Sequence, residues 1–243
     1  MPATGPARAT ACPRSRPEPQ AASADMSDLI DISPPVGPAS PVYPGDAPYR
    51  RDWQSRIGPD CAINLSAITL SPHAGAHADA PLHYDAAGQS AGELDLEPFI
   101  GHCRVIHAIG CGPRVQWRDI AHALPADQTV PPRILIRTYR LQPRQWDPEL
   151  AGLEPELVER LAELGVRLIG IDSASVDPAD SFALESHQAL RRRGLRVLEN
   201  LCLDAVKAGD YELIALPLKL IDCEASPVRA VLRPWPGRWP GPL

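Results

Sequence analysis

Several features of common protein classes are missing from this chain of 243 residues. No apolar run approaches the ~18 residues of a membrane-spanning helix, so the sequence predicts no membrane partner. Basic residues form no stripe and the net charge is −6, which argues against nucleic acid and anionic membranes as ligands.

The cysteines are few and scattered. None of the six belongs to a C-x-x-C pair, which disfavours cysteine-ligated zinc. Isolated thiols are typical of a reducing compartment, and we expect the protein to be cytoplasmic. A metal site in this chain would therefore be built from histidine, aspartate and glutamate.

Composition divides the chain into one long segment and two short ends. Residues 1–25 are rich in proline, alanine and arginine and lack the apolar core of a signal peptide, so we expect a disordered extension, with Met26 as an alternative start. Residues 26–233 are expected to form one domain, because 44% apolar content allows one sizeable core. Residues 234–243, rich in proline and tryptophan, are expected to be loose, extended chain.

The hydrophobic pattern predicts strands with three helices among them. The expected strands are residues 28–32, 62–70, 103–109, 133–138, 167–172, 195–199, 211–218 and 228–233. The expected helices are residues 117–123, 155–164 and 183–193. Because helix and strand alternate over residues 155–199, the sequence predicts an α/β fold.

The most informative segment is residues 71–84, which read SPHAGAHADAPLHY. His73, His77, Asp79 and His83 lie within 11 residues, although the whole chain has only seven histidines. All four positions are odd, so in an extended segment their side chains would point to one face. Such a gathering of polar, ligand-type side chains is unfavourable in a core and indicates a site.

The segment must bend for these side chains to share that site. A straight strand would spread them over ~33 Å. Gly75 and Pro81 are the positions at which the chain can bend. A helical His-x-x-x-His site is excluded, because Pro72, Gly75 and Pro81 interrupt the helical period. We therefore predict a metal site on bent, extended chain.

Nitrogen and oxygen ligands without thiolate suit Zn²⁺, Mn²⁺ or Fe²⁺. Asp79 has two carboxylate oxygens and so could bridge two ions. Further ligands must come from elsewhere, and two later residues are suitable: His187, near the start of a predicted helix, and Glu199, at the end of a predicted strand. Each also has an ordinary interpretation, as a surface or capping histidine and as a solvated strand end.

Other polar residues are interpreted structurally. His102, His107 and His122 lie in or beside apolar elements and are not assigned to the site. Asp172 ends a predicted strand and would either orient a ligand or form an Asx-turn. Arg191 to Arg193 are interpreted as a charge cluster at a helix C-terminus.

The run from His73 to His83 resembles the H-x-G-T-H-x-D-x-P-x-H pattern of the cyclase-type metal-dependent hydrolases. Within that family, the chain is most similar to the bacterial kynurenine formamidase branch. The likeness continues in order through residues 31–46, 68–84, 131–140, 168–178 and 209–233. The resemblance implies a single-domain cyclase-like fold of the swivelling β/β/α type, with a mixed sheet or small barrel and flanking helices.

The resemblance also implies roles for individual residues and two divalent metal ions per subunit, usually zinc. His73 and His77 would bind the first ion and His187 the second, while Asp79 and Glu199 would contact both. His83 would donate and accept protons instead of binding metal, and Tyr43 would touch the substrate.

Three residues depart from the family pattern. Ala76 replaces threonine, and Tyr43 stands where tryptophan is usual, which keeps an aromatic wall but adds a hydroxyl. Asn200 follows Glu199 where glycine is common, and asparagine tolerates a left-handed backbone better than most residues.

The implied reaction is the hydrolysis of N-formyl-L-kynurenine to L-kynurenine and formate, a step of tryptophan degradation. Water activated at the metal site would attack the formyl carbon, and His83 would give a proton to the departing nitrogen. One alternative is a related hydrolase of another amide, ester or lactam. A second alternative is a metal-binding protein without turnover on the same fold. The family is commonly dimeric, so a homodimer is expected, in which a proline-rich segment such as residues 33–48 could reach the partner.

Overall fold

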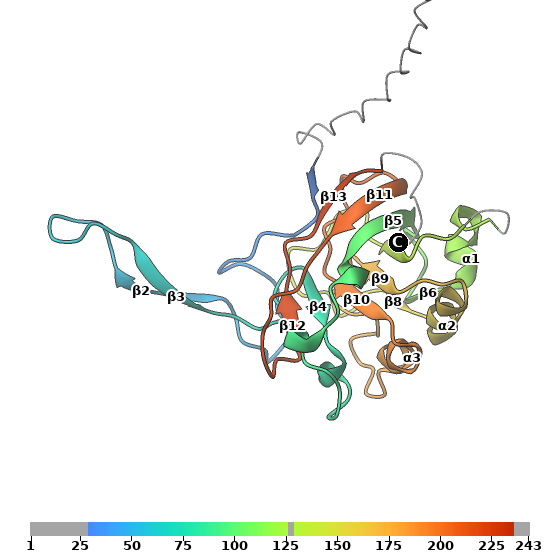
Figure 1. Ribbon diagram of the computed structural model, residues 1–243, viewed down its shortest axis with the longest axis horizontal. Helices are drawn as coiled ribbons and strands as arrows, with labels where there is room; N and C mark the ends of the chain where they lie inside the picture. Colours follow the sequence, from blue (N-terminus) through green and yellow to red (C-terminus); the bar gives the residue numbers. More distant parts are fainter. Residues whose placement is uncertain (1–28, 126–128, 236–243) are drawn as a thin grey trace, which may run out of the picture.

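The computed structural model describes residues 29–125 and 129–235 (Figure 1). The expected extension at residues 1–25 and residues 236–243 of the expected tail lie outside the described residues, so this division of the chain stays a prediction. Within the described ranges, every helix is too short or too polar to cross a membrane.

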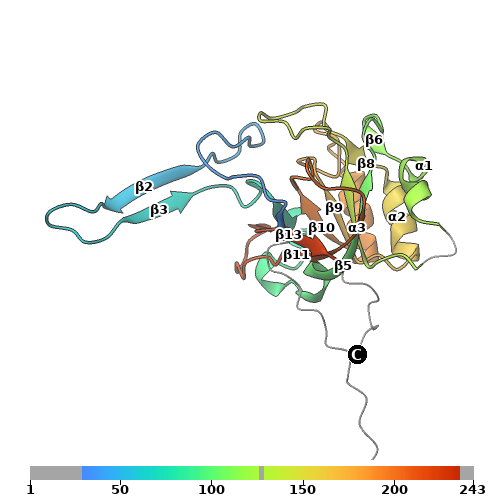
Figure 2. The same ribbon diagram turned by 90° about the horizontal axis from the view of Figure 1, so that it is seen from above.

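One mixed, curled sheet forms the body of the molecule (Figures 1 and 2). Its nine strands run in the order β1 (Ile30–Asp31), β13 (Val231–Pro234), β11 (Gly209–Ile214), β5 (Ile100–His107), β7 (Arg133–Arg137), β9 (Leu168–Ile171), β10 (Arg196–Glu199), β4 (His77–Asp79) and β12 (Ala225–Pro227). Strands β5, β7, β9 and β10 pair in parallel, and the neighbours on either side pair antiparallel. The predicted α/β fold with a mixed sheet is confirmed.

Apolar side chains alternate along the central strands and so fill two layers. In β7, Ile134 and Ile136 pack under the helices, while Leu135 points into the concave layer. The helices α1 (Trp117–Ile120), α2 (Pro155–Glu163) and α3 (Glu185–Arg193) lie together on one side of the sheet (Figure 1). Because strands buried on both faces read as continuous apolar runs, the sequence identifies them clearly.

The eight predicted strands and three predicted helices all occur, with shifted ends. The strand expected over residues 211–218 stops at Ile214, and the helix expected over residues 117–123 becomes a 3₁₀ turn at Ala121–Ala123. Sequence reasoning did not identify the short strands β2 (Arg50–Ser55), β6 (Arg114–Val115), β8 (Gly152–Leu153) and β12. These segments are too brief or too polar to produce a periodic signal.

A hairpin arm projects from the body. It consists of β2 and β3 (Leu65–Thr69), which pair with each other and not with the main sheet, and it extends away from the other strands in both views (Figures 1 and 2). Residues 34–43 of the proline-rich segment contribute to the walls of cavities in their own chain, and the contact of this segment with a partner stays a prediction.

Candidate metal centre

The segment from His73 to His83 bends at the two predicted places. Gly75 has φ +70°, a left-handed conformation, and a Cβ there would approach Val36 Cγ2 to 2.5 Å. After this turn, His77 and Asp79 lie on the same face of β4. Pro81 then begins a 3₁₀ turn that ends at His83.

Sheet pairing brings a distant carboxylate to this segment. Strand β10 runs antiparallel to β4 and places Glu199 directly opposite His77. His187 enters from α3 and is buried. The structure therefore brings together all six side chains for which metal binding or proton transfer was predicted: His73, His77, Asp79, His83, His187 and Glu199.

The imidazole nitrogens and carboxylate oxygens alternate around the centre. His77 Nε2 lies 3.4 Å from Asp79 Oδ1 and 3.3 Å from Glu199 Oε2. His187 Nε2 lies 3.3 Å from Asp79 Oδ2 and 3.5 Å from Glu199 Oε1. His73 Nδ1 lies 3.0 Å from Asp79 Oδ1. Each carboxylate thus turns one oxygen toward His77 and the other toward His187.

The four separations of 3.3–3.5 Å around His77 and His187 fit metal ligands. Two atoms held ~2.0–2.2 Å from one tetrahedral ion lie about 3.3–3.6 Å apart, whereas a charge-assisted N–H···O bond is about 2.7–2.9 Å long. Within the described part of the chain, His77 Nε2 and Asp79 Oδ1 are buried without a hydrogen-bond partner. Because buried polar atoms are rarely left unsatisfied, the donor set fits a cation. The chain thus contains a buried His/Asp/Glu group that can bind a metal.

Neighbouring groups fix which nitrogen each histidine presents. His77 Nδ1 lies 2.9 Å from the carbonyl oxygen of Gly75, and His187 Nδ1 lies 2.8 Å from Asp177 Oδ2. Asp177 also accepts the backbone N–H groups of Ser186 and His187. Sequence reasoning missed Asp177, although it lies only ten residues before His187.

The charges in this cluster depend on one another. Burial alone lowers the pKa of His77, but the Glu199 and Asp79 carboxylates raise it to about 9. Burial likewise opposes protonation of His187, yet Asp177 and Asp79 raise its pKa well above the usual value. Without a cation, protons on the imidazoles balance the buried carboxylates, and a bound divalent ion would displace them.

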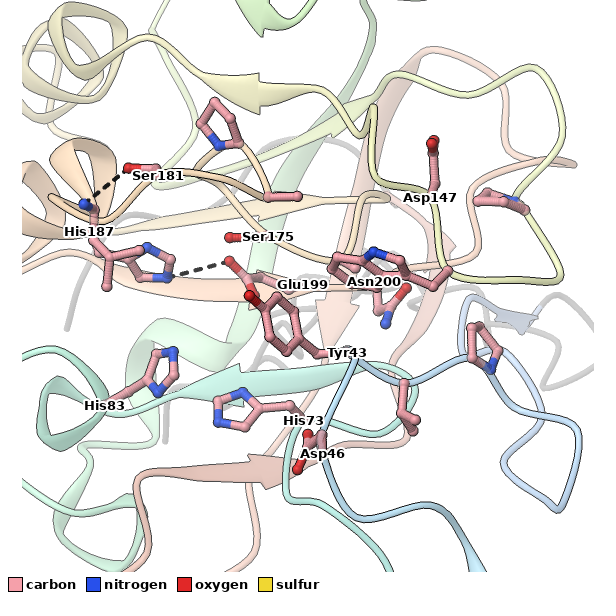
Figure 3. Close-up of a pocket in the computed structure, with 18 of the residues that line it drawn as sticks. Tyr43, Asp46, His73, His83, Asp147, Ser175, Ser181, His187, Glu199 and Asn200 are labelled. Atoms are coloured by element: carbon pink, nitrogen blue, oxygen red, sulfur yellow. Dashed lines mark hydrogen bonds and ion pairs between the residues drawn. The ribbon is translucent and has the colours of Figure 1, made fainter.

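The centre lies at the floor of a cavity of about 460 Å³. His73, His83, His187 and Glu199 face this space (Figure 3). The His83 ring lies 4.4 Å from that of His73, measured between centroids. Burial lowers the pKa of His83, which favours its neutral imidazole form.

Aromatic side chains line the mouth of this cavity. Tyr43 reaches into it (Figure 3). The Tyr43 ring contacts the Trp146 ring edge-to-face, with centroids 5.0 Å apart. Tyr139 and Asp147 also line the cavity. The Tyr139 hydroxyl donates a hydrogen bond to Asp147 Oδ2 over 2.8 Å, next to Trp146 in the chain. The cavity therefore offers a flat ring both an aromatic wall and direct access to the centre.

Other polar residues take structural positions. Asp172 accepts hydrogen bonds from Thr138 and Tyr139. It therefore neither orients a metal ligand nor forms an Asx-turn, the two roles predicted for it. Its carboxylate points across to the end of the neighbouring strand and anchors the loop that leads to Trp146. Asn200 has φ 58°, as expected for the residue after Glu199.

The three remaining histidines lie elsewhere, as expected. His107 Nε2 lies 2.9 Å from the carbonyl oxygen of Val206, and His102 stacks on Trp235. His122 lies in the 3₁₀ turn after α1.

The model of the Cyclase family matches residues 30–178, which include the His73–His83 segment. The chain belongs to this family. A solved structure described as a predicted metal-dependent hydrolase from Bacillus stearothermophilus is 26% identical, has a TM-score of 0.71 and is covered over 97% of its chain and 84% of this one. Isatin hydrolase A from Labrenzia aggregata is 23% identical with a TM-score of 0.72, over 85% of this chain and 93% of that one, and shares the fold.

Curated relatives are more similar in sequence. The kynurenine formamidase of Delftia acidovorans is 65% identical over 205 residues, which are 84% of this chain and 97% of the relative. The kynurenine formamidase of Bordetella pertussis is 57% identical over 209 residues, which are 86% of this chain and 99% of the relative.

Proposed function

We propose that this chain is an arylformamidase that hydrolyses N-formyl-L-kynurenine to L-kynurenine and formate, in tryptophan degradation. The observation that carries the proposal is the metal-ligand set beside His83 at the floor of an aromatic cavity, in a chain 65% identical to a named kynurenine formamidase. The ligand set supports metal-dependent hydrolysis, and the relatives indicate the substrate.

We further propose two divalent ions per subunit, with zinc preferred and Mn²⁺ or Fe²⁺ as alternatives. His73 and His77 would hold the first ion and His187 the second, while Asp79 and Glu199 would contact both. The support is the alternation of ligand atoms, in which Oδ1 and Oδ2 of Asp79 face different histidines. When bound, such ions lower the pKa of water toward ~7 and polarise a carbonyl oxygen.

The protein side chains hold the substrate and move the proton. Tyr43 and Trp146 form a wall against which the anilide ring can lie. The oxygen of water adds to the formyl carbon, the carbon–nitrogen bond breaks, and formate leaves. His83 takes the proton from the oxygen that has added to the formyl carbon and passes it to the anilinic nitrogen as the carbon–nitrogen bond breaks, because its ring faces the cavity beside the metal ligands.

The test is turnover by the zinc-loaded protein. We expect hydrolysis of N-formyl-L-kynurenine, slower hydrolysis of formanilide, and no opening of an unrelated lactam. His83→Gln should retain its metal and lose about 10²–10⁴-fold in kcat. Turnover only of another amide, ester or lactam would replace the proposed substrate, and intact metal content without any turnover would support a purely metal-binding protein.

We also propose a homodimer in which the hairpin arm contacts a second copy. The arm carries apolar side chains that are exposed in the single chain, namely Trp53, Ile57, Ile63, Leu65 and Ile68. A two-stranded hairpin is marginally stable alone, and exposed apolar surface marks contact sites. Light scattering should give twice the chain mass for the unmodified protein and a lower mass for Ile63→Asp/Ile68→Asp.

The proposed location is the cytoplasm. The cysteines within the described ranges, Cys61, Cys103, Cys111, Cys202 and Cys223, are free thiols. A reducing compartment keeps thiols in that form.

A further inference from the structure

The segment that carries His83 has little regular structure of its own. After the 3₁₀ turn at Pro81–His83, residues 84–90 continue as turns and irregular chain. The chain then returns, so that the Leu82 N–H donates to the carbonyl oxygen of Gln89 over 3.0 Å. The direction of the His83 ring therefore depends on what holds this loop in place.

Helix α3 holds the loop immediately after His83. The Gln188 side-chain amide donates to the backbone carbonyl oxygen of Tyr84 over 3.0 Å. One turn further along the helix, Arg191 Nε donates to Asp85 Oδ2 over 2.7 Å. Gln188 directly follows His187, so the same helix places a proposed metal ligand and fixes the loop of the proposed proton donor.

We propose that Gln188 and Arg191 are positioning residues for His83. They hold the His83–Asp85 backbone against α3 and thereby keep the imidazole at a fixed distance from the metal centre. This inference rests on the role of His83 in the proposed function. Because a misplacement of ~1 Å can cost about 100-fold in rate, two contacts at the adjoining backbone suffice to matter.

A single side-chain hydrogen bond and a half-exposed ion pair contribute little to the stability of the whole protein. Arg191 is about half exposed (48%), and ion pairs between exposed groups stabilise proteins only slightly. We therefore expect their loss to shift Tm by less than about 4 °C. A large kinetic effect with a small Tm effect would separate positioning from general destabilisation.

Arg191→Gln and Arg192→Gln form a matched pair of variants. Both remove one charge from the last turn of α3, but Arg192 pairs with Glu159 of α2 and does not contact the His83 loop. Arg191→Lys retains a donor for Asp85 and should restore most of the activity. The double variant Gln188→Ala/Arg191→Gln removes both contacts.

The deciding measurement is the dependence of kcat on the leaving group, across formanilides with electron-withdrawing ring substituents and 4-nitrophenyl formate. A leaving group that needs no proton does not need His83. The double variant should lose about 10-fold or more with unsubstituted formanilide and less than about 2-fold with 4-nitrophenyl formate, with KM and metal content unchanged. His83→Ala should show the same pattern more strongly, and Arg192→Gln should resemble the unmodified protein.

Hydrogen exchange in the metal-free protein provides a readout that does not require activity. The backbone amides of Leu82, His83 and Tyr84 should exchange faster in the double variant than in the unmodified protein. Their exchange rates should be unchanged in Arg192→Gln. A loss that is equal for all leaving groups, unchanged exchange, or a His83→Ala protein without leaving-group dependence would overturn the inference. Failure to hydrolyse N-formyl-L-kynurenine alone would overturn only the proposed substrate, because formanilides and exchange still report on the loop.

Discussion

His187 Nδ1 lies 2.8 Å from Oδ2 of Asp177, a carboxylate with no exposed surface. A ring nitrogen that donates to a carboxylate leaves the opposite nitrogen free to bind metal. Asp177 therefore sets the tautomer of His187 and directs Nε2 toward the centre. The same carboxylate accepts two backbone N–H groups at the start of α3, so it fixes both the helix and the ring.

Asp177→Asn should weaken metal binding at His187 while leaving the fold intact. The amide retains the shape of the side chain but loses the charge that strengthens the ligand, and such changes cost about 10–100-fold in metal affinity. Competition against a chromophoric chelator would measure the affinity. Asp180→Asn changes an exposed residue of the same loop and is the control. Equal metal affinities of the two variants would show that Asp177 stabilises only the start of α3 and does not affect metal binding by His187.

Metal loading should depend steeply on pH. With its pKa raised to about 9, His77 is protonated at neutral pH in the metal-free protein and must release this proton to bind a cation. Calorimetry in buffers of different ionisation enthalpy should show release of about one proton or more per ion near pH 7. A binding enthalpy that is independent of the buffer would contradict this assignment.

The stability of the metal-free protein should fall as the pH rises, whereas metal binding should strengthen. A raised histidine pKa contributes stability that is fully present below the unfolded value of ~6.5 and is lost as pH rises through about 9. The Tm difference between loaded and metal-free protein should therefore widen from pH 6 to pH 9.5. A constant difference would show that His77 does not carry this proton.

Much of the fold and the candidate site could be predicted because local patterns agree with the final packing. The centre of β7, residues 134–136, is apolar because both faces of that strand are buried. The turn at Gly75 and the break at Pro81 follow from backbone sterics alone.

Other features depend on contacts that a sequence does not reveal. Residues 62–70 resemble a core strand, yet β3 pairs only with β2, and Ile68 remains exposed. Apolar periodicity indicates that a face will be covered but not what covers it. Likewise, the pairing of His187 with Asp177 requires a particular path of the intervening loop, and the Gln188 contact requires α3 to lie beside the His83 loop.

Replacement of Tyr43 should affect substrate binding more than chemistry. Its edge-to-face contact with Trp146 forms the aromatic wall, and such contacts are worth ~0.5–1.5 kcal/mol. Tyr43→Ala should raise KM for N-formyl-L-kynurenine roughly 2- to 12-fold with kcat nearly unchanged. Tyr43→Phe keeps the ring and should remain close to the unmodified protein. Equal damage by both substitutions would assign the effect to the hydroxyl.

Asp147 should favour a substrate that carries an ammonium group. Among the described residues that line the cavity there is no lysine or arginine, whereas Asp46, Asp147 and Glu224 are acidic. The Asp147 carboxylate is held in place by the Tyr139 hydroxyl and by the backbone N–H of Glu149. It is thus oriented before substrate arrives.

Asp147→Asn should therefore raise KM for N-formyl-L-kynurenine, whose amino acid group carries an α-ammonium beside its carboxylate, by about 10-fold. It should leave KM unchanged for N-formyl-2′-aminoacetophenone, which has the same formamide and ring but no amino acid group. Glu149→Gln removes an exposed carboxylate two residues away, keeps the backbone donor, and should change neither value. If Asp147→Asn raised both KM values equally, the carboxylate would act by holding Tyr139 and not by attracting the ammonium group.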